Sequence, residues 1–388
     1  MTTNTTLLRA IFIFMAATSI ITIGVQPILV GLLADHFQIA IESQGWLIST
    51  EMTGIVVGTL MGVNLANRVG ALRFCIAAAL LALLGNALTA FADGQTILLG
   101  FRFVAGVGAG LLYAYAIYIL GQLPGYDRSF GLLLFVQTAA FCLFASTLPG
   151  IAESSGFQVA IFSIAAWFVA IGISSLALPK HIEANDAKTD TRLHGGVRVV
   201  GLFALLGMLF LQLSIYSIWG FVDGIGEKAG ISAMDIGWAF GIGFLGGLPG
   251  AALPSLLGGR LNRGLMIVIG SLIVLLSVIM LANVVQSATG LAVAMFLMNL
   301  GWMLALTYYM SLVVANDPSA QLAKWISLVQ AGASAIAPAL IAALIDIVGG
   351  NIFYILSASA VVLGCILTLG ALLTWGRPAS AVCTGSAS

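Results

Sequence analysis

A single carboxylate stands in the apolar segment LISTEMTGIVVG, residues 47–58. This carboxylate belongs to Glu51, and no Lys or Arg lies within two helical turns of it along the chain. A second isolated ionisable residue, Arg102, stands in another apolar segment. An ion in hydrocarbon is costly, so such side chains normally face the protein interior and find a partner. An acid and a base buried together could bind and release a proton.

The composition shows which environment surrounds these two residues. Of the 388 residues, 61% are apolar and 7% are charged, whereas an ordinary soluble domain is roughly 25% charged. Apolar stretches of about 20 residues, long enough to cross a ~30 Å hydrocarbon core as helix, follow one another along nearly the whole chain. The sequence therefore predicts an all-α integral membrane protein. The first apolar run, 8–33, lacks the pattern of a cleaved signal peptide and is expected to remain as a span.

Charged residues, Gly/Pro turns and the ends of apolar runs divide the chain into twelve predicted transmembrane helices. They cover residues 8–33, 45–66, 72–92, 97–120, 130–150, 157–178, 199–222, 234–257, 264–285, 290–314, 325–347 and 351–375. We expect two six-helix halves, 1–178 and 199–376, joined by a cytoplasmic linker at 179–198. Residues 377–388 are expected to form a disordered cytoplasmic tail.

The basic residues predict that both chain ends lie in the cytoplasm, because positively charged loops stay on that side of the membrane. With the N-terminus inside, 12 of the 14 Lys and Arg residues fall on cytoplasmic segments. Of the other two, Lys228 falls outside and Arg102 lies within the fourth span. We therefore expect a multi-pass protein of the inner (cytoplasmic) membrane, working as a monomer in the lipid bilayer.

The two halves share short matches in the same order, at an offset near 193 residues. Gly45-Trp46 corresponds to Gly237-Trp238 before the second span of each half. Within the fifth and eleventh spans, Val136-Gln137 corresponds to Val329-Gln330. Such matches predict a duplicated six-helix unit whose copies are related by an axis along the membrane normal, with the binding site at their interface.

Two six-helix halves with a charged central loop, and an Arg-x-Gly turn after the second span of each half, resemble the major facilitator superfamily. In the two turns, Asn67-Arg68 corresponds to Asn262-Arg263. The family signature Gly-x-Leu-Ala-Asp-Arg-x-Gly-Arg-Lys is similar to VNLANRVGALR, residues 63–73. In the family the Asp and the Arg are thought to latch the halves in one conformation. Since Asn67 replaces that Asp, the resemblance implies a weaker, neutral latch here.

The fourth span carries a second signature. The family pattern Arg-x-x-x-Gly-x-Gly resembles RFVAGVG, residues 102–108, and the family associates this arginine with proton coupling. The fifth span lacks the Gly-Pro signature of the drug–proton antiporter branch, because Phe144-Ala145 stands at the equivalent position. This difference disfavours a drug antiporter.

The depths of Glu51 and Arg102 predict that the two side chains meet. Each lies five or six residues from the outer end of its span, roughly 8–10 Å below the outer boundary at 1.5 Å per residue. Protonation of Glu51 would free Arg102 to hold an anionic substrate, and departure of the substrate would restore the pair and expel the proton. Each ligand then favours binding of the other. Two alternatives are a hydrogen-bonded packing role for Glu51 and a structural role for Arg102.

Polar and aromatic residues at depth form candidate substrate contacts. On the seventh span, Gln212, Tyr216 and Trp219 follow at intervals that place them on one helix face, with Asp223 one turn further. Such a stripe suits a substrate cavity, or alternatively a packing seam with an interfacial aromatic belt. The predicted substrate-binding residues are Thr22, Gln26, Arg102, Tyr113, Gln137, Gln212, Tyr216, Trp219, Asn299, Trp302 and Gln330. The polar ones could instead be satisfied core groups.

Glycines recur every four residues at Gly54, Gly58 and Gly62 on the second span and at Gly106 and Gly110 on the fourth. Small residues at this spacing predict close helix packing. The GVGAG run does not follow a strand, so it fails the context that a nucleotide-binding glycine loop requires.

These patterns predict a secondary active transporter that moves a small organic solute by alternating access, coupled to protons. An acid is slightly favoured as the solute, because Arg102 is the only basic residue at depth. Proton-driven efflux of amphipathic or drug-like compounds is the main alternative. An intramembrane enzyme is a remote alternative, since all three histidines lie in loops. The sequence indicates no cofactor, metal site or nucleic-acid partner.

Overall fold

The computed structural model describes residues 5–39, 41–180, 182, 195–219, 221–283, 285, 287–317 and 320–375. Most of the predicted linker and the predicted tail lie outside these ranges. The structure describes the backbone of Asp223 but not its side chain. The described residues form helices joined by short turns, without β-strands.

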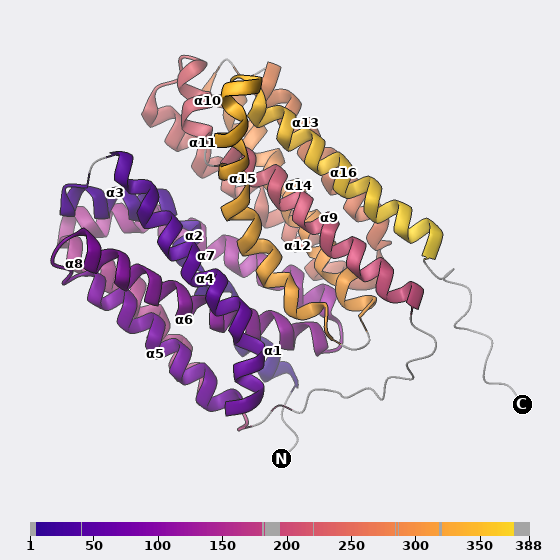
Figure 1. The fold of residues 1–388 in the computed structure, drawn as a ribbon, viewed down its shortest axis with the longest axis horizontal. Coiled ribbons are helices and arrows are strands. Elements are labelled where there is room, and N and C mark those ends of the chain that lie inside the picture. Colours follow the sequence, from indigo (N-terminus) through magenta and orange to yellow (C-terminus); the bar gives the residue numbers. More distant parts are fainter. Residues whose placement is uncertain are drawn as a thin grey trace, which may run out of the picture.

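The two halves appear in Figure 1 as two bundles, one indigo to magenta and the other pink to yellow. The first half contains α1 (Thr5–Ser19), α2 (Ile21–Gly24), α3 (Gln26–Phe37), α4 (Ile41–Val69), α5 (Ala71–Thr89), α6 (Gln95–Gln122), α7 (Tyr126–Ser155) and α8 (Phe157–Ser175). The second half contains α9 (Gly195–Trp219), α10 (Val222–Lys228), α11 (Ala233–Leu245), α12 (Gly247–Leu257), η1 (Gly258–Arg260), α13 (Arg263–Asn283), α14 (Ala288–Ala315), η2 (Ala323–Trp325), α15 (Ile326–Val348) and α16 (Ile352–Trp375).

The helices reproduce the predicted membrane architecture. Ten helical segments of the described chain are long and apolar enough to cross a membrane. Of the two remaining predicted spans, α15 supplies the eleventh as a helix of 23 residues. The first is built from α1, α2 and α3 in succession. The all-α fold with two helical halves is therefore confirmed.

The first predicted span differs from the prediction of one helix over 8–33, because it is interrupted twice. The backbone leaves helical geometry at Ile20 and again at Val25. Proline follows directly, in the first turn of α3. Proline has no amide hydrogen and its ring clashes with the carbonyl of the preceding turn, so a helix cannot run through this position undisturbed. Pro27 was the signal in the sequence for this break.

The two ends of the bundle are named here by the chain segments that they hold. The terminal face is the end at which α1 begins and α16 ends, and the distal face is the end at which α3 ends and α4 begins (Figure 1). The halves meet where α7 packs on α12 and α14, and where α15 packs on α4 and α6. Toward the terminal face this packing is tight, since a Cβ on Gly131 would lie 2.5 Å from Ser255 N.

Candidate functional site

The close packing of α4 on α6 positions Glu51 beside Arg102. A Cβ on Gly54 would lie 2.3 Å from the carbonyl oxygen of Phe103, and a Cβ on Gly106 would lie 2.3 Å from that of Glu51. No side chain fits at such distances, so the glycines allow the two backbones to touch. The predicted packing role of these glycines is confirmed. The Glu51 backbone touches α6 at Gly106, which is one helical turn after Arg102.

Glu51 and Arg102 form a buried ion pair. Glu51 Oε1 lies 2.5 Å from Arg102 Nη2. Arg102 is 1% exposed and is among the largest fully buried side chains of the described residues, while Glu51 is 5% exposed. The predicted contact between the two is therefore confirmed. Their predicted role in proton coupling remains a prediction.

Asn86 of α5 is a third member of this site. Arg102 Nη1 donates a hydrogen bond to Asn86 Oδ1 at 3.0 Å. Asn86 Nδ2 in turn donates to the Ala82 carbonyl at 2.9 Å, which fixes the amide with its oxygen toward the guanidinium. Sequence reasoning missed Asn86, although a polar amide inside the apolar third span was a usable signal.

Arg102 keeps donors that no described residue satisfies. Its Nε and Nη2 atoms have no hydrogen-bond partner among the described residues. Nη2 lies 2.5 Å from Glu51 Oε1 and is held in the ion pair, so it becomes available only when that pair breaks, whereas Nε is unpaired in this arrangement. Unpaired buried donors cost free energy. Arg102 can therefore donate a hydrogen bond to a further group, such as a hydroxyl, carbonyl or carboxylate oxygen.

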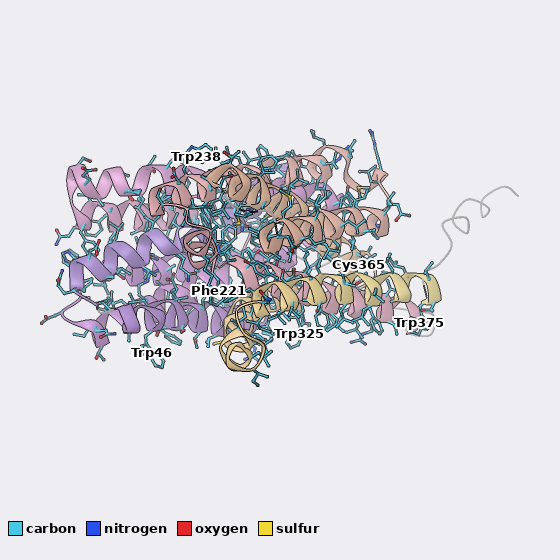
Figure 2. The ribbon with its side chains drawn as sticks, turned by 90° about the horizontal axis from the view of Figure 1, so that it is seen from above. Trp46, Phe221, Trp238, Trp325, Cys365 and Trp375 are labelled. Atoms are coloured by element: carbon cyan, nitrogen blue, oxygen red, sulfur yellow. The ribbon has the colours of Figure 1, made fainter. Side chains whose placement is uncertain are left out.

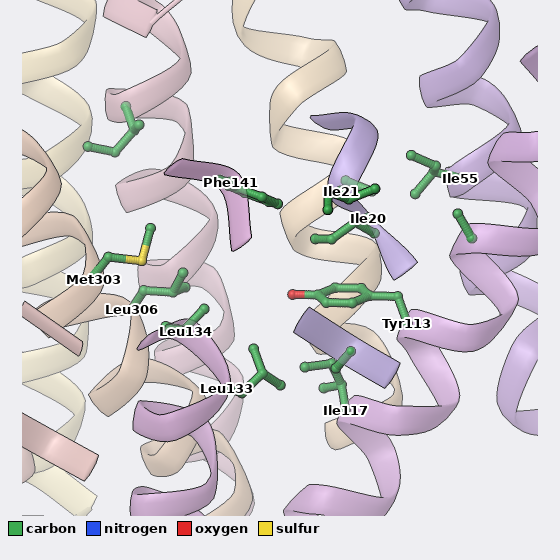
Figure 3. Close-up of a cluster of buried hydrophobic side chains, with 14 of the residues drawn as sticks. Ile20, Ile21, Ile55, Tyr113, Ile117, Leu133, Leu134, Phe141, Met303 and Leu306 are labelled. Atoms are coloured by element: carbon green, nitrogen blue, oxygen red, sulfur yellow. The ribbon is translucent and has the colours of Figure 1, made fainter. Parts of the chain in front are cut away.

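Tyr113 links the two halves further along α6. Its hydroxyl donates to Gln330 Oε1 of α15 at 2.5 Å. Figure 3 shows this hydroxyl directed away from α6, at the end of the Tyr113 ring. Eleven residues separate Tyr113 from Arg102 on the same helix, which corresponds to about 16 Å along its axis. A small solute at the Tyr113–Gln330 contact therefore does not touch Arg102 directly.

An aromatic cluster occupies the second half. Trp302 Nε1 donates to Gln212 Oε1 at 2.5 Å. The Trp302 ring centroid lies 5.9 Å from that of Trp219 and 6.1 Å from that of Tyr216, in edge-to-face arrangements. Phe240 of α11 extends the cluster, with its centroid 4.7 Å from Trp219. The structure thus brings together four predicted residues from two different helices, and adds an aromatic ring that the sequence analysis missed.

Three predicted residues of the first half retain buried polar atoms without a hydrogen-bond partner among the described residues. These atoms are Thr22 Oγ1, Gln26 Nε2 and Gln137 Oε1. Thr22 lies on α2, which packs on α7, the helix that carries Gln137. Since buried polar atoms are normally paired, these three are available to a polar ligand or to water.

Asn299 has a different environment from the other candidates. It is 1% exposed, and its Nδ2 donates to the Met295 carbonyl of its own helix at 2.9 Å. This bond matches the alternative of a satisfied core amide. The described contacts do not join Asn299 to any of the clusters above.

Known proteins resemble this chain along most of its length. The family model of the Major Facilitator Superfamily matches residues 9–318. The chain belongs to this family. Among solved structures, FucP, a Major Facilitator Superfamily transporter in the outward conformation, superposes with a TM-score of 0.74 at 14% identity, covering 95% of this chain and 98% of FucP. The human organic anion transporter MFSD10 (TETRAN) superposes with a TM-score of 0.70 at 15% identity, covering 94% and 99%.

A curated relative matches over a short segment. The arabinose-proton symporter of Escherichia coli K12 is 33% identical over 89 residues, which is 23% of this chain and 19% of the symporter. The match therefore spans only about a fifth of that relative's length. It is consistent with the family, and the two structural neighbours share the fold.

In this superfamily transporter a second ion pair joins the halves at the terminal face. Asp127 Oδ1 accepts a hydrogen bond from Arg263 Nε at 2.7 Å, and Oδ2 accepts one from Nη2 at 2.8 Å. The guanidinium also lies 5.5 Å from the ring centroid of Tyr126. Sequence reasoning identified Arg263 as the counterpart of Arg68 but missed Asp127. The available signal was that Asp127 and Arg263 are both predicted to lie on the cytoplasmic side of the membrane.

The weaker, neutral latch expected at Asn67 is not part of this contact. Asn67 and Arg68 are both exposed, and neither takes part in an ion pair of the described residues. The ionic contact between the halves instead uses Asp127 of the first half and Arg263 of the second.

Proposed function

We propose that this transporter couples proton movement to transport of a small organic solute, by alternating access between its two halves. Its place would be the inner membrane, with the terminal face in the cytoplasm. The buried Glu51–Arg102 pair carries the proposal. An acid and a base at membrane depth are expensive to keep, and such residues commonly mark proton or substrate pathways.

The coupling follows from a change of partner at Arg102. When Glu51 takes up a proton, its attraction for the guanidinium falls, while the bond from Arg102 to Asn86 can persist. The free Nε and Nη2 donors then bind an oxygen of the solute, or of a group that moves when the solute binds. Departure of that oxygen returns Arg102 to Glu51 and expels the proton. By linkage, proton and solute each favour the binding of the other.

The polar groups outside the ion pair favour a hydroxyl-rich solute. Thr22, Gln26 and Gln137 are neutral and hold unpaired atoms, and the second half contributes amides and aromatic faces. Hydroxyl groups both donate and accept hydrogen bonds, which suits such side chains. The short resemblance to an arabinose-proton symporter supports the same class. A carboxylic acid is the alternative, with Arg102 as its partner.

Transport by purified protein in proteoliposomes tests the coupling. A panel of radiolabelled pentoses, hexoses and carboxylic acids is offered with and without an inward proton gradient. We expect Glu51→Gln to exchange solute across the membrane at equilibrium but to lose accumulation driven by the gradient. Glu153→Gln is the matched control, because Glu153 is an exposed carboxylate at the end of α7.

Two outcomes would overturn the proposal. If Glu51→Gln accumulates solute under the gradient as well as wild type does, the Glu51 carboxylate takes no part in coupling. If wild type accumulates the solute equally well without a proton gradient, the proton is not the driving ion.

A second candidate function is efflux of amphipathic compounds, which the aromatic cluster around Trp219 favours. Aromatic faces attract apolar and cationic molecules. In inverted vesicles, proton-driven uptake of a dye such as ethidium, with no transport of the sugars or acids, would establish this function in place of the first.

A further inference from the structure

A cavity separate from the candidate transport site lies between the halves at the terminal face. It has a volume of about 190 Å³ and is lined by α4 on one side and by η2 and the start of α15 on the other. The lining residues are Thr59, Leu60, Val63, Asn64, Gln321, Lys324, Trp325 and Leu328. Since a water molecule takes about 30 Å³ of liquid, the cavity has room for a group the size of a phosphate.

The polar part of the cavity carries positive charge. Lys324 Nζ donates to Gln321 Oε1 at 3.3 Å and lies 5.9 Å from the Tyr118 ring centroid. No carboxylate pairs with it in the part of the chain that the structure describes, and none lines the cavity. Arg68 follows Asn64 by one helical turn on α4 and is exposed. An anion entering here therefore meets one cation at once and a second nearby.

The rest of the lining is apolar and reaches the outer surface of the bundle. Leu60 is 50% exposed and Trp325 is 48% exposed, and Figure 2 shows Trp325 at the periphery of the helices. Tryptophan with a basic residue is typical of the level of the lipid headgroups. The lining thus changes from polar to apolar in the way that a phospholipid changes from headgroup to acyl chain.

We propose that this cavity binds one phospholipid from the surrounding leaflet, with its anionic phosphate on Lys324 and an acyl chain along Leu60 and Leu328. Basic pockets between transmembrane helices bind anionic headgroups in this manner. The bound lipid touches α4 of the first half and α15 of the second, so it stabilises the arrangement in which the halves are closed at the terminal face. This lipid is a ligand of the protein and is separate from its transported solute.

Fluorescence quenching in reconstituted vesicles tests the proposal. Phosphatidylglycerol or phosphatidylcholine, each brominated on its acyl chains, is added at equal mole fraction to phosphatidylcholine vesicles that contain the transporter. The signal of Trp325 is the difference between wild type and Trp325→Phe. We expect phosphatidylglycerol to quench Trp325 more than phosphatidylcholine does. Equal quenching by the two lipids would overturn the proposal.

The excess quenching is the amount by which brominated phosphatidylglycerol quenches Trp325 more than brominated phosphatidylcholine does. Substitution of Lys324 tests whether this excess comes from lipid in the cavity. Lys324→Gln should lower the relative affinity for phosphatidylglycerol about fivefold, equivalent to about 1 kcal/mol for one Lys near the membrane surface. Lys324→Arg should restore it, because the charge returns. Lys180→Gln is the matched control, since Lys180 is exposed beyond the end of α8 at the same face. An equal loss in Lys180→Gln would indicate general surface attraction and would overturn the site.

Two further measurements distinguish a bound lipid from a free anion and from a purely structural lysine. Inorganic phosphate is added at constant ionic strength against chloride, and we expect no loss of quenching at Trp325. Displacement by phosphate alone would assign the cavity to a free anion and overturn the lipid. Lys324→Gln should also melt in detergent at the wild-type temperature. If its melting temperature falls and Lys324→Arg does not restore the excess quenching, the lysine is structural and the proposal fails.

Discussion

The two ion pairs of this transporter have different geometry and different surroundings. Glu51 and Arg102 belong to one half and make a single short contact that leaves donors unpaired. Asp127 and Arg263 belong to different halves and form two aligned hydrogen bonds. Arg102 is 1% exposed, whereas the Arg263 side chain is 28% exposed.

The geometry of the two pairs indicates which one can respond to a ligand and which one can hold a conformation. Arg102 can exchange one acceptor for another while both halves keep their places, because its partners all lie in the first half. The two bonds between Arg263 and Asp127 bridge the halves, so they cannot persist when the halves move apart at the terminal face. A proton or solute is therefore best sensed at the first pair, and the closed arrangement is stabilised by the second.

The largest effect is expected when the buried pair loses one partner. Glu51→Ala should lower the free energy of unfolding by about 3–5 kcal/mol, because it leaves Arg102 buried without a counter-charge. The double variant Glu51→Leu with Arg102→Met should recover most of the loss. Thermal melting in detergent measures both. A single variant as stable as wild type would show that Arg102 does not depend on Glu51.

Removal of the charge at Asp127 should act on conformation more than on stability. Asp127→Asn should weaken the closed terminal face by about 1.5–3 kcal/mol, the range for hydrogen bonds to charged groups. Distances between spin labels on the two halves should then shift toward an arrangement open at the terminal face. Asp93→Asn, at an exposed carboxylate of the distal face, serves as the control. If exchanging the charges, with Asp127→Arg and Arg263→Asp, fails to restore the closed distances, the pair does not hold the halves.

The glycine contact tests whether the first pair depends on helix packing. Gly106→Ala places a Cβ 2.3 Å from the Glu51 carbonyl oxygen, so α4 and α6 must separate, at about 1–3 kcal/mol. Gradient-driven transport should fall as it does in Glu51→Gln. Gly100→Ala is the matched control, because Gly100 lies on the same helix and a Cβ there would meet nothing within 4 Å. Normal transport in Gly106→Ala would mean that the pair tolerates a displaced helix.

The smallest effect is expected at a neutral hydrogen bond, which sharpens the contrast with the two charged pairs. Trp302→Phe removes the donor to Gln212 and leaves a smaller aromatic ring beside Trp219 and Tyr216. Loss of the hydrogen bond is a change of about 0.5–1.5 kcal/mol. Affinity for the transported solute should fall by roughly threefold to tenfold, with the proton dependence unchanged. Trp238→Phe, at a residue that is 55% exposed, should leave the affinity unaltered. A changed proton dependence in Trp302→Phe would contradict the separation of the two regions.

The sequence predicted a large part of the candidate site but only some of its contacts. The pairing of Glu51 with Arg102 was predictable, because two lone charges at equal depth have few other partners. The bond from Arg102 to Asn86 was not predictable, because it depends on which face of α5 is turned toward α6, and this orientation is set by the packing of the helices. The contact of Tyr113 with Gln330 joins residues 217 positions apart, and many polar residues at similar depth could have met.

The amino-acid sequence was enough to predict the membrane environment, the twelve spans and the duplicated halves, because hydropathy and repeats are properties of the chain read in order. It also predicts how far along its span each ionisable residue lies, since a helix rises by a constant 1.5 Å per residue. The folded structure was needed to find that Asp127 meets Arg263, 136 residues away, and that a lysine and a tryptophan of η2 face α4 across a cavity. These contacts depend on how the two halves pack, which is the sum of many distant interactions and is not encoded in any short segment.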